Sequence, residues 1–216
     1  MRFYEKRFNT SGYAVENKLT ILNFGLHTID EQYKTLYDYN TNMLRTTTEC
    51  MSAILGGANI ICNLPYDAIY HKDNEFGERI ARNQLLILQK EAYLEEAQSF
   101  ANGAYYIENI TNQLAEIALS IFKQIEKGGG FLKQLKAGTI QKKIQESAQK
   151  EQQQFDSHQI TLLGTNRLPN KEDSMKDNLE IYPFLKKNIS KTLIPPILQE
   201  RLSEQHERHR LETELL

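Results

Sequence analysis

The sequence contains no tryptophan and only two cysteines, Cys50 and Cys62. They form no Cys-x-x-Cys pair, so we expect two reduced thiols that behave as small apolar side chains, as is usual in the cytoplasm. A redox or nucleophilic role is the alternative, but the sequence indicates no partner base for either thiol. No apolar run approaches the roughly 20 residues that a membrane span needs, and residues 1–10 lack the apolar core of a signal peptide. The net charge of -2 gives no electrostatic basis for binding nucleic acid or an anionic membrane.

Residues 37–70 predict a helix, a turn, a short strand and a loop. Asn40 and Thr41 offer capping oxygens at the amino end, and Gly56-Gly57 is a typical helix stop. The apolar run of residues 60–62 does not alternate, which is typical of a strand covered on both faces. One helix face is predicted by three- and four-residue spacing: Leu44, Thr47, Met51 and Leu55. This order of elements is typical of a parallel α/β fold.

Two later stretches have the helical period. Residues 75–97 carry a broad apolar face, and residues 110–125 have the most regular spacing in the chain. We interpret the glycine run 128–130 as the end of the second helix. It is not a phosphate-binding loop, because it lacks the Lys-Ser/Thr of that motif. Residues 145–154 are nearly all polar, which is typical of a helix lying on a surface.

Candidate strands are few. Residues 19–24 and 160–164 are two of them, and residues 105–107 predict a brief extended segment after a turn. A closed parallel barrel needs eight strands, so we expect a partner or the rest of a larger domain to complete this core. The tail from residue 197 has helical propensity but polar side chains on nearly all sides. We therefore expect it to be frayed or docked on a partner protein.

Several motifs resemble the barrel domain of methylmalonyl-CoA mutases. They are residues 37–57, Gly77-Glu-Arg-Ile-Ala-Arg-Asn-Gln84, and residues 102–108, 125–129, 142–156 and 163–166. The similarity covers most of residues 38–173, and the polar tail is more similar to the small, non-cobalamin subunit of the two-subunit bacterial enzymes. The resemblance implies an α/β fold: the carboxyl-terminal part of a (β/α)8 TIM-type barrel, helix-rich, followed by a helical linker and a tail.

The resemblance also implies a division of the chain and a function. Residues 1–34 match poorly, residues 35–130 are the partial barrel, residues 131–172 a helical linker and residues 173–216 a charged tail. The family reaction is the adenosylcobalamin-dependent radical isomerisation of methylmalonyl-CoA and succinyl-CoA in propionate metabolism. We expect adenosylcobalamin and the acyl-CoA substrate on a cobalamin-binding large subunit, which would form a cytoplasmic heterodimer with this chain.

Three departures from the catalytic chains predict that this chain holds no catalytic or cofactor-binding residue. Tyr37 stands where they have a substrate-contacting glutamine. Their Gln-Ser-Leu-His-Thr-Asn-like strand is here Asn59-Ile-Ile-Cys-Asn-Leu64, and Leu64 cannot orient a thioester carbonyl by hydrogen bonding. The cobalamin signature Asp-x-His-x-x-Gly is incomplete, because Thr161 replaces its glycine. We therefore interpret His158 as a surface residue at a helix end.

The best candidates for a substrate-facing pocket are Asn63, Tyr66 and Asp67, at the carboxyl end of the predicted strand. The alternative for Asp67 is to cap the loop through its own backbone. His206 and His209 share a helix face, but the sequence offers no third ligand nearby, so we predict no metal site.

Three arginines on helix bodies match the geometry of coenzyme A phosphates: Arg45, Arg79 and Arg82. We favour ordinary pairing with acids such as Glu49 and Glu78 on neighbouring turns.

The sequence therefore predicts all or part of a mutase small subunit that supports a catalytic partner. Two alternatives stay open at this point. One is an independently active acyl-CoA mutase chain, and the other is a non-enzymatic or truncated remnant that acts only as an interaction module.

Overall fold

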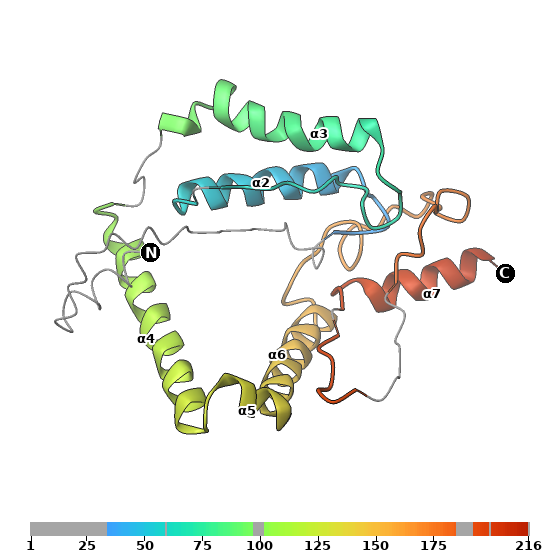
Figure 1. Ribbon diagram of the computed structural model, residues 1–216. Coiled ribbons are helices and arrows are strands. Elements are labelled where there is room, and N and C mark those ends of the chain that lie inside the picture. The colour runs from blue at the N-terminus through green and yellow to red at the C-terminus, as the bar shows by residue number, and fades with distance from the viewer. Residues whose placement is uncertain (1–33, 59, 97–101, 185–191, 199, 216) are drawn as a thin grey trace.

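The computed structural model describes residues 34–58, 60–96, 102–184, 192–198 and 200–215, and these residues are largely helical. In Figure 1, two helices lie side by side, three more form a V-shaped arm, and the last lies beyond the end of that arm. The helices are α2 (Thr41–Leu55), α3 (Glu75–Leu86), α4 (Tyr105–Lys127), α5 (Phe131–Lys136), α6 (Thr139–Asp156) and α7 (Glu204–Leu215). Two short turns follow α3, the π-helical η2 (Ile87–Glu91) and the 3-10 turn η3 (Leu94–Glu96).

The helix predicted from residues 110–125 is confirmed as α4, and the glycine run ends it. Gly129 and Gly130 both have positive φ, 98° and 88°, which only glycine adopts at little cost. The prediction of an extended segment at residues 105–107 is wrong, since Tyr105 begins α4. The turn at residues 102–103 lets the helix begin there at once.

The predicted helix after Asn40 is confirmed as α2, but its buried face differs from the predicted one. The buried side chains are Asn42, Thr46, Cys50 and Ala53, whereas Leu44 is 69% exposed and Met51 is also exposed. The buried face is therefore half polar: Thr46 bonds Gln84 of α3, whereas Cys50 packs against Leu88. Asn40 makes no capping bond through its side chain; the Thr41 hydroxyl instead donates to Asp38 O at 2.7 Å.

The helix predicted over residues 75–97 is shorter as a regular α-helix. It begins after Asn74, whose Oδ1 accepts the N–H of Gly77 at 2.7 Å, and its α-helical part ends at Leu86. The π-helical turn η2 continues it and buries Leu88 against Cys50.

The prediction of a strand at residues 60–62 is wrong for this chain. Ile60 and Cys62 are exposed, and no strand ladder is formed anywhere among the described residues. At residues 160–164 the structure has one isolated bridge, from Leu163 to Arg167, in place of the predicted strand. The strand predicted at residues 19–24 lies outside the described residues. The helix-rich part of the predicted fold class is therefore confirmed, and the barrel stays a prediction.

Among the described residues, three groups of buried side chains form the core. The largest joins the start of the described chain to α7 and contains Leu36, Tyr37, Ile69, Tyr70, Met175, Phe184 and Leu211. A second group joins α2 to η2 through Cys50 and Leu88. A third joins α6 to the residues just before α7, and it contains Phe155, Leu162 and Leu202.

The carboxyl-terminal helix differs most from its prediction. We expected a frayed helix or one docked on a partner, but α7 packs on its own chain and buries Glu204, Glu207 and Leu211. It packs against the residues just before α2, because Leu211 belongs to the same buried cluster as Leu36 and Tyr37. None of the helices in the described ranges has both the length and the apolar content needed to cross a membrane.

Candidate functional site

Asn63 lies before the turn into residues 65–71, which we call the candidate loop, and its side chain contacts α3. Its Nδ2 donates to Ala81 O at 3.0 Å and to Gln84 Oε1 at 2.8 Å, while its Oδ1 is buried without a hydrogen-bond partner. Gln84 Nε2 in turn donates to the hydroxyls of Thr46 and Thr47 on α2, at 2.8 and 2.7 Å. Asn63 therefore belongs to a polar interface between α2 and α3.

Tyr66 is a buried aromatic residue of the candidate loop. Its ring stacks on Tyr39 with 6.5 Å between centroids and meets the edge of Phe76 at 6.4 Å. Burial raises the pKa of its phenol, with Asp67 next to it adding to the effect. These contacts make Tyr66 a packing residue between the start of α2 and the start of α3.

Asp67 is only 2% exposed and lies at the amino end of α3. Its Oδ2 is 3.1 Å from His71 Nδ1 and accepts a bond from Asn74 Nδ2 at 2.8 Å. Its Oδ1 is buried with no hydrogen-bond partner and lies against Gly77, where an added Cβ would be 2.6 Å away. A carboxylate at a helix amino end is favoured by the helix dipole. Asp67 therefore stabilises the start of α3 with its side chain, in addition to the loop bonds that its backbone carbonyl accepts.

The three predicted pocket residues thus lie along α3 but do not converge. Asp67 contacts its first turn and Asn63 its last turns, and the polar bonds of both go to the chain itself. A hollow of about 400 Å³ lies elsewhere, along α4, and is lined by Glu116, Leu119, Ser120, Lys123, Gln124 and Lys127.

Tyr37 is 2% exposed and lies beneath α7. The guanidinium of Arg210 stands 3.9 Å from the centre of its ring, close enough for a cation–π interaction. Burial and the Glu214 carboxylate raise the pKa of Tyr37 well above its usual range. The side chain that replaces the substrate-contacting glutamine of the catalytic chains is therefore part of the chain's own core.

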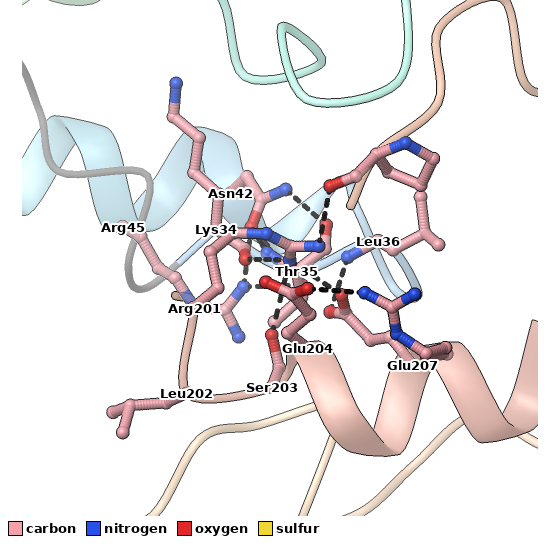
Figure 2. A network of polar contacts seen from close by, with 12 residues as sticks. Lys34, Thr35, Leu36, Asn42, Arg45, Arg201, Leu202, Ser203, Glu204 and Glu207 are labelled. Carbon is pink, nitrogen blue, oxygen red and sulfur yellow. Dashed lines mark hydrogen bonds and ion pairs between the residues drawn. The ribbon is translucent and has the colours of Figure 1, made fainter. Parts of the chain in front are cut away.

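A buried ion pair that the sequence did not suggest closes this region, as Figure 2 shows. Arg201 is 8% exposed and donates to Glu207 Oε2 at 2.6 Å and to Lys34 O at 3.1 Å. The other oxygen of Glu207 accepts the N–H of Leu36 at 2.8 Å. Each charge has its partner and additional hydrogen bonds, which is the condition under which buried ions are tolerated.

Asn42 connects this network to α2. Its Oδ1 accepts from Thr35 N at 2.9 Å and from Arg45 at 2.7 Å, and its Nδ2 donates to Thr35 O at 2.8 Å. The Lys34 ammonium extends the network to the candidate loop by donating to Pro65 O at 3.0 Å.

One signal in the sequence could have indicated the network. Glu204, Glu207 and Leu211 recur at helical spacing, so they share one face of α7, and Arg201 precedes that face. Charged residues on such a face normally indicate solvent exposure, because isolated charges are costly to bury. Glu207 is buried instead because Arg201 lies beside it in the folded chain, which the sequence alone does not indicate.

The other candidate residues have structural roles. Arg45 bonds Thr35, Asn42 and Leu163 O. Burial lowers its pKa, and the charges of nearby acids, Glu49 among them, oppose that shift. Arg79 lies over the ring of Phe76 at 5.6 Å, while Arg82 is exposed.

The structure also shows the surroundings of the candidate histidines and of the two thiols. His158 is exposed just beyond α6 with φ of 61°, as predicted for a helix-end residue. His206 meets the ring of Phe155 at 5.5 Å, and no cluster of three metal-binding side chains occurs among the described residues. Both cysteines are free, and burial raises the pKa of Cys50 to about 11.

The known proteins to which the chain is similar are methylmalonyl-CoA mutases. A family model described as methylmalonyl-CoA mutase matches residues 3–212. A methylmalonyl-CoA mutase small subunit of Porphyromonas gingivalis is 38% identical over 148 residues, 68% of this chain and 24% of that protein. The large subunit of the same organism is 35% identical over 142 residues, 65% of this chain and 20% of its own length. A methylmalonyl-CoA mutase of Escherichia coli is 33% identical over 150 residues, 69% of this chain and 21% of that protein. The chain therefore spans between a fifth and a quarter of the length of these relatives.

Proposed function

We propose that this chain, which belongs to the methylmalonyl-CoA mutase family, is all or part of a small subunit that supports a catalytic large subunit. The supported reaction is the isomerisation of methylmalonyl-CoA and succinyl-CoA. The chain's own part is packing, and the radical chemistry belongs to the partner. The proposed assembly is a heterodimer in the cytoplasm.

The observation that carries this proposal is the environment of Tyr37. Its ring is buried beneath Arg210, and the neighbouring Leu36 N–H is bonded to the buried Glu207. An acyl-CoA thioester needs exposed hydrogen-bond donors held near its carbonyl. Here the Leu36 N–H is already used within the chain and the Tyr37 side chain is buried, which suits a supporting subunit better than a catalytic one.

The sequence around His158 does not fit cobalamin. The incomplete signature ends at Thr161 instead of glycine, and His158 is exposed just beyond α6 with a left-handed backbone. We therefore assign no step of the reaction to a cofactor held here. Adenosylcobalamin is proposed for the large subunit.

Exposed apolar side chains support the proposal that the chain completes a larger barrel. One face of α4 carries five that are each at least 44% exposed: Ile107, Leu114, Ile117, Ile121 and Phe122. A bare apolar helix face is unfavourable in water, so we propose that the remaining βα units of a mutase barrel cover this face of α4.

The test is co-expression with a cobalamin-binding large mutase subunit, followed by size-exclusion chromatography with mass detection. We expect a one-to-one complex. Ile117→Asp should weaken it because the variant places a charge in the apolar face, whereas Asn112→Asp, on the opposite side of α4, should not. A chain that stays alone contradicts the supporting role. Turnover of acyl-CoA by this chain alone with added adenosylcobalamin also contradicts that role, and favours an independent mutase.

A further inference from the structure

Residues 173–184, which we call the bridging segment, lie between the candidate loop and α7. On the loop side, Tyr70 O accepts the N–H groups of Glu180 and Ile181 at 2.9 and 3.0 Å. The ring of His71 reaches the same segment, with Nε2 3.1 Å from Asn178 Oδ1. The bridging segment contains no helix or strand, so its conformation depends on these contacts and on those of its other side.

On its other side the bridging segment is bonded to α7. Glu214 Oε2 accepts the N–H of Met175 at 3.0 Å, and the Arg208 guanidinium stands 4.6 Å from the centre of the Phe184 ring. Arg210 also donates to the carbonyl of Asp173. The contacts come from three positions along α7 and reach both ends of the segment.

Apolar packing runs through the same three elements. Tyr70 of the candidate loop, Met175 and Phe184 of the bridging segment and Leu211 of α7 belong to one buried cluster. Well-packed clusters transmit a displacement, because a close-packed interior cannot absorb it locally. The loop, the segment and the helix are therefore joined by both polar and apolar contacts.

We propose that α7 sets the conformation of the candidate loop through the bridging segment. The buried Arg201–Glu207 pair fixes α7 against Lys34 and Leu36. With α7 in place, the bridging segment presents its N–H groups to Tyr70 and its amide to His71. Without α7, the segment keeps neither its apolar cover nor its bonds to Glu214, and the loop loses the bonds that Tyr70 and His71 make to the segment. The carboxyl-terminal helix thus acts on the conformation of the loop that contains Tyr66 and Asp67. This inference concerns the folded chain itself and does not depend on the proposed partner.

Hydrogen exchange followed by mass spectrometry on the full chain tests the coupling. Glu207→Gln removes the charge that pairs with Arg201 while keeping the side chain's size. We expect exchange to rise roughly tenfold or more in peptides from the bridging segment and the candidate loop, since local opening exposes their amides. Peptides from α4, which belongs to a different part of the fold, should change by less than about twofold. Glu212→Gln is the matched control, because Glu212 is an exposed acid of the same helix.

Arg210→Lys is a second, milder variant in case Glu207→Gln unfolds the chain. It keeps the positive charge but loses the guanidinium's bonds to Asn170 O and Asp173 O and its planar contact with the Tyr37 ring. We expect the same pattern of exchange at a smaller amplitude. An increase limited to α7 in Arg210→Lys shows that the helix opens without the loop and overturns the proposal. An equal increase over the whole chain overturns it as well, because it shows global unfolding instead of a directed coupling.

Discussion

Substituting Gly77 by alanine tests whether the Asp67 carboxylate is firmly held at the start of α3. A Cβ at this position would lie 2.6 Å from Asp67 Oδ1, 3.1 Å from Pro65 Cβ and 3.3 Å from Asn74 Nδ2. The first distance is too short for a non-bonded contact, so the carboxylate must move. It is not the free end of a flexible side chain, because its other oxygen bonds Asn74 and His71.

Two effects of opposite sign decide the outcome of Gly77→Ala. Alanine is better than glycine within a helix by about 1 kcal/mol. Displacing Asp67 weakens bonds to a charged group, each of which contributes about 1.5–3 kcal/mol. Two such bonds are at risk, so the loss exceeds the gain. We expect the free energy of unfolding to fall by about 1–3 kcal/mol.

The assay is urea unfolding of the full chain followed by circular dichroism, with the free energy taken by linear extrapolation. Glu78→Ala is the control, since Glu78 is exposed on the same helix turn and its loss should change the free energy by less than about 0.5 kcal/mol. An unchanged or increased free energy of unfolding for Gly77→Ala would refute the reasoning. It would mean that Asp67 can leave the amino end of α3 without cost.

Two further predictions follow from groups described above. At pH 8, iodoacetamide should modify the exposed Cys62 in the folded chain and should modify Cys50 only after denaturation, because burial raises the pKa of Cys50 to about 11. Peptide mass spectrometry measures the labelling of both thiols, and labelling of Cys50 in the folded chain would contradict its burial. Although burial acts to raise it, hydrogen bonds from the Met175 N–H and from neighbouring side chains hold the pKa of Glu214 below its ordinary 4.5. The ionised Glu214 therefore contributes stability that is present above pH 4.5 and is lost as the pH falls through the lowered pKa. Acidification should thus destabilise the natural chain more steeply than the Glu214→Gln variant. Equal losses of unfolding free energy with falling pH, measured by urea unfolding, would contradict this.

The sequence predicted best the elements whose signal is local. α4 has regular helical spacing and ends at a glycine run with positive φ, and both features are visible without any knowledge of the fold. Tyr105 was assigned wrongly because aromatic and β-branched residues favour strands in general, while the turn just before it decides the local structure. Residues 60–62 have strand propensity, but a strand also needs a neighbouring strand, which the described chain does not supply.

The candidate residues were harder to assign, because their contacts are not local. Asn63 and Asp67 are polar residues near a turn, which is typical both of a ligand-facing loop and of a helix cap. The structure gives them bonds to Ala81 and Asn74, and sequence spacing alone does not distinguish the two roles. The Arg201–Glu207 pair was missed for a related reason: burial of a charge depends on partners far away in the chain.

The bond between Glu207 and the Leu36 N–H joins residues 171 positions apart, and this separation affects how the chain is made. Ribosomes add about 5–20 residues per second, so Leu36 waits roughly 10–30 seconds before α7 is synthesised. During that time the apolar side chains around Tyr37 lack their cover and are open to chaperones or to other nascent chains. This core therefore forms only after α7 has been synthesised, which makes successful folding a report that synthesis has reached Leu211.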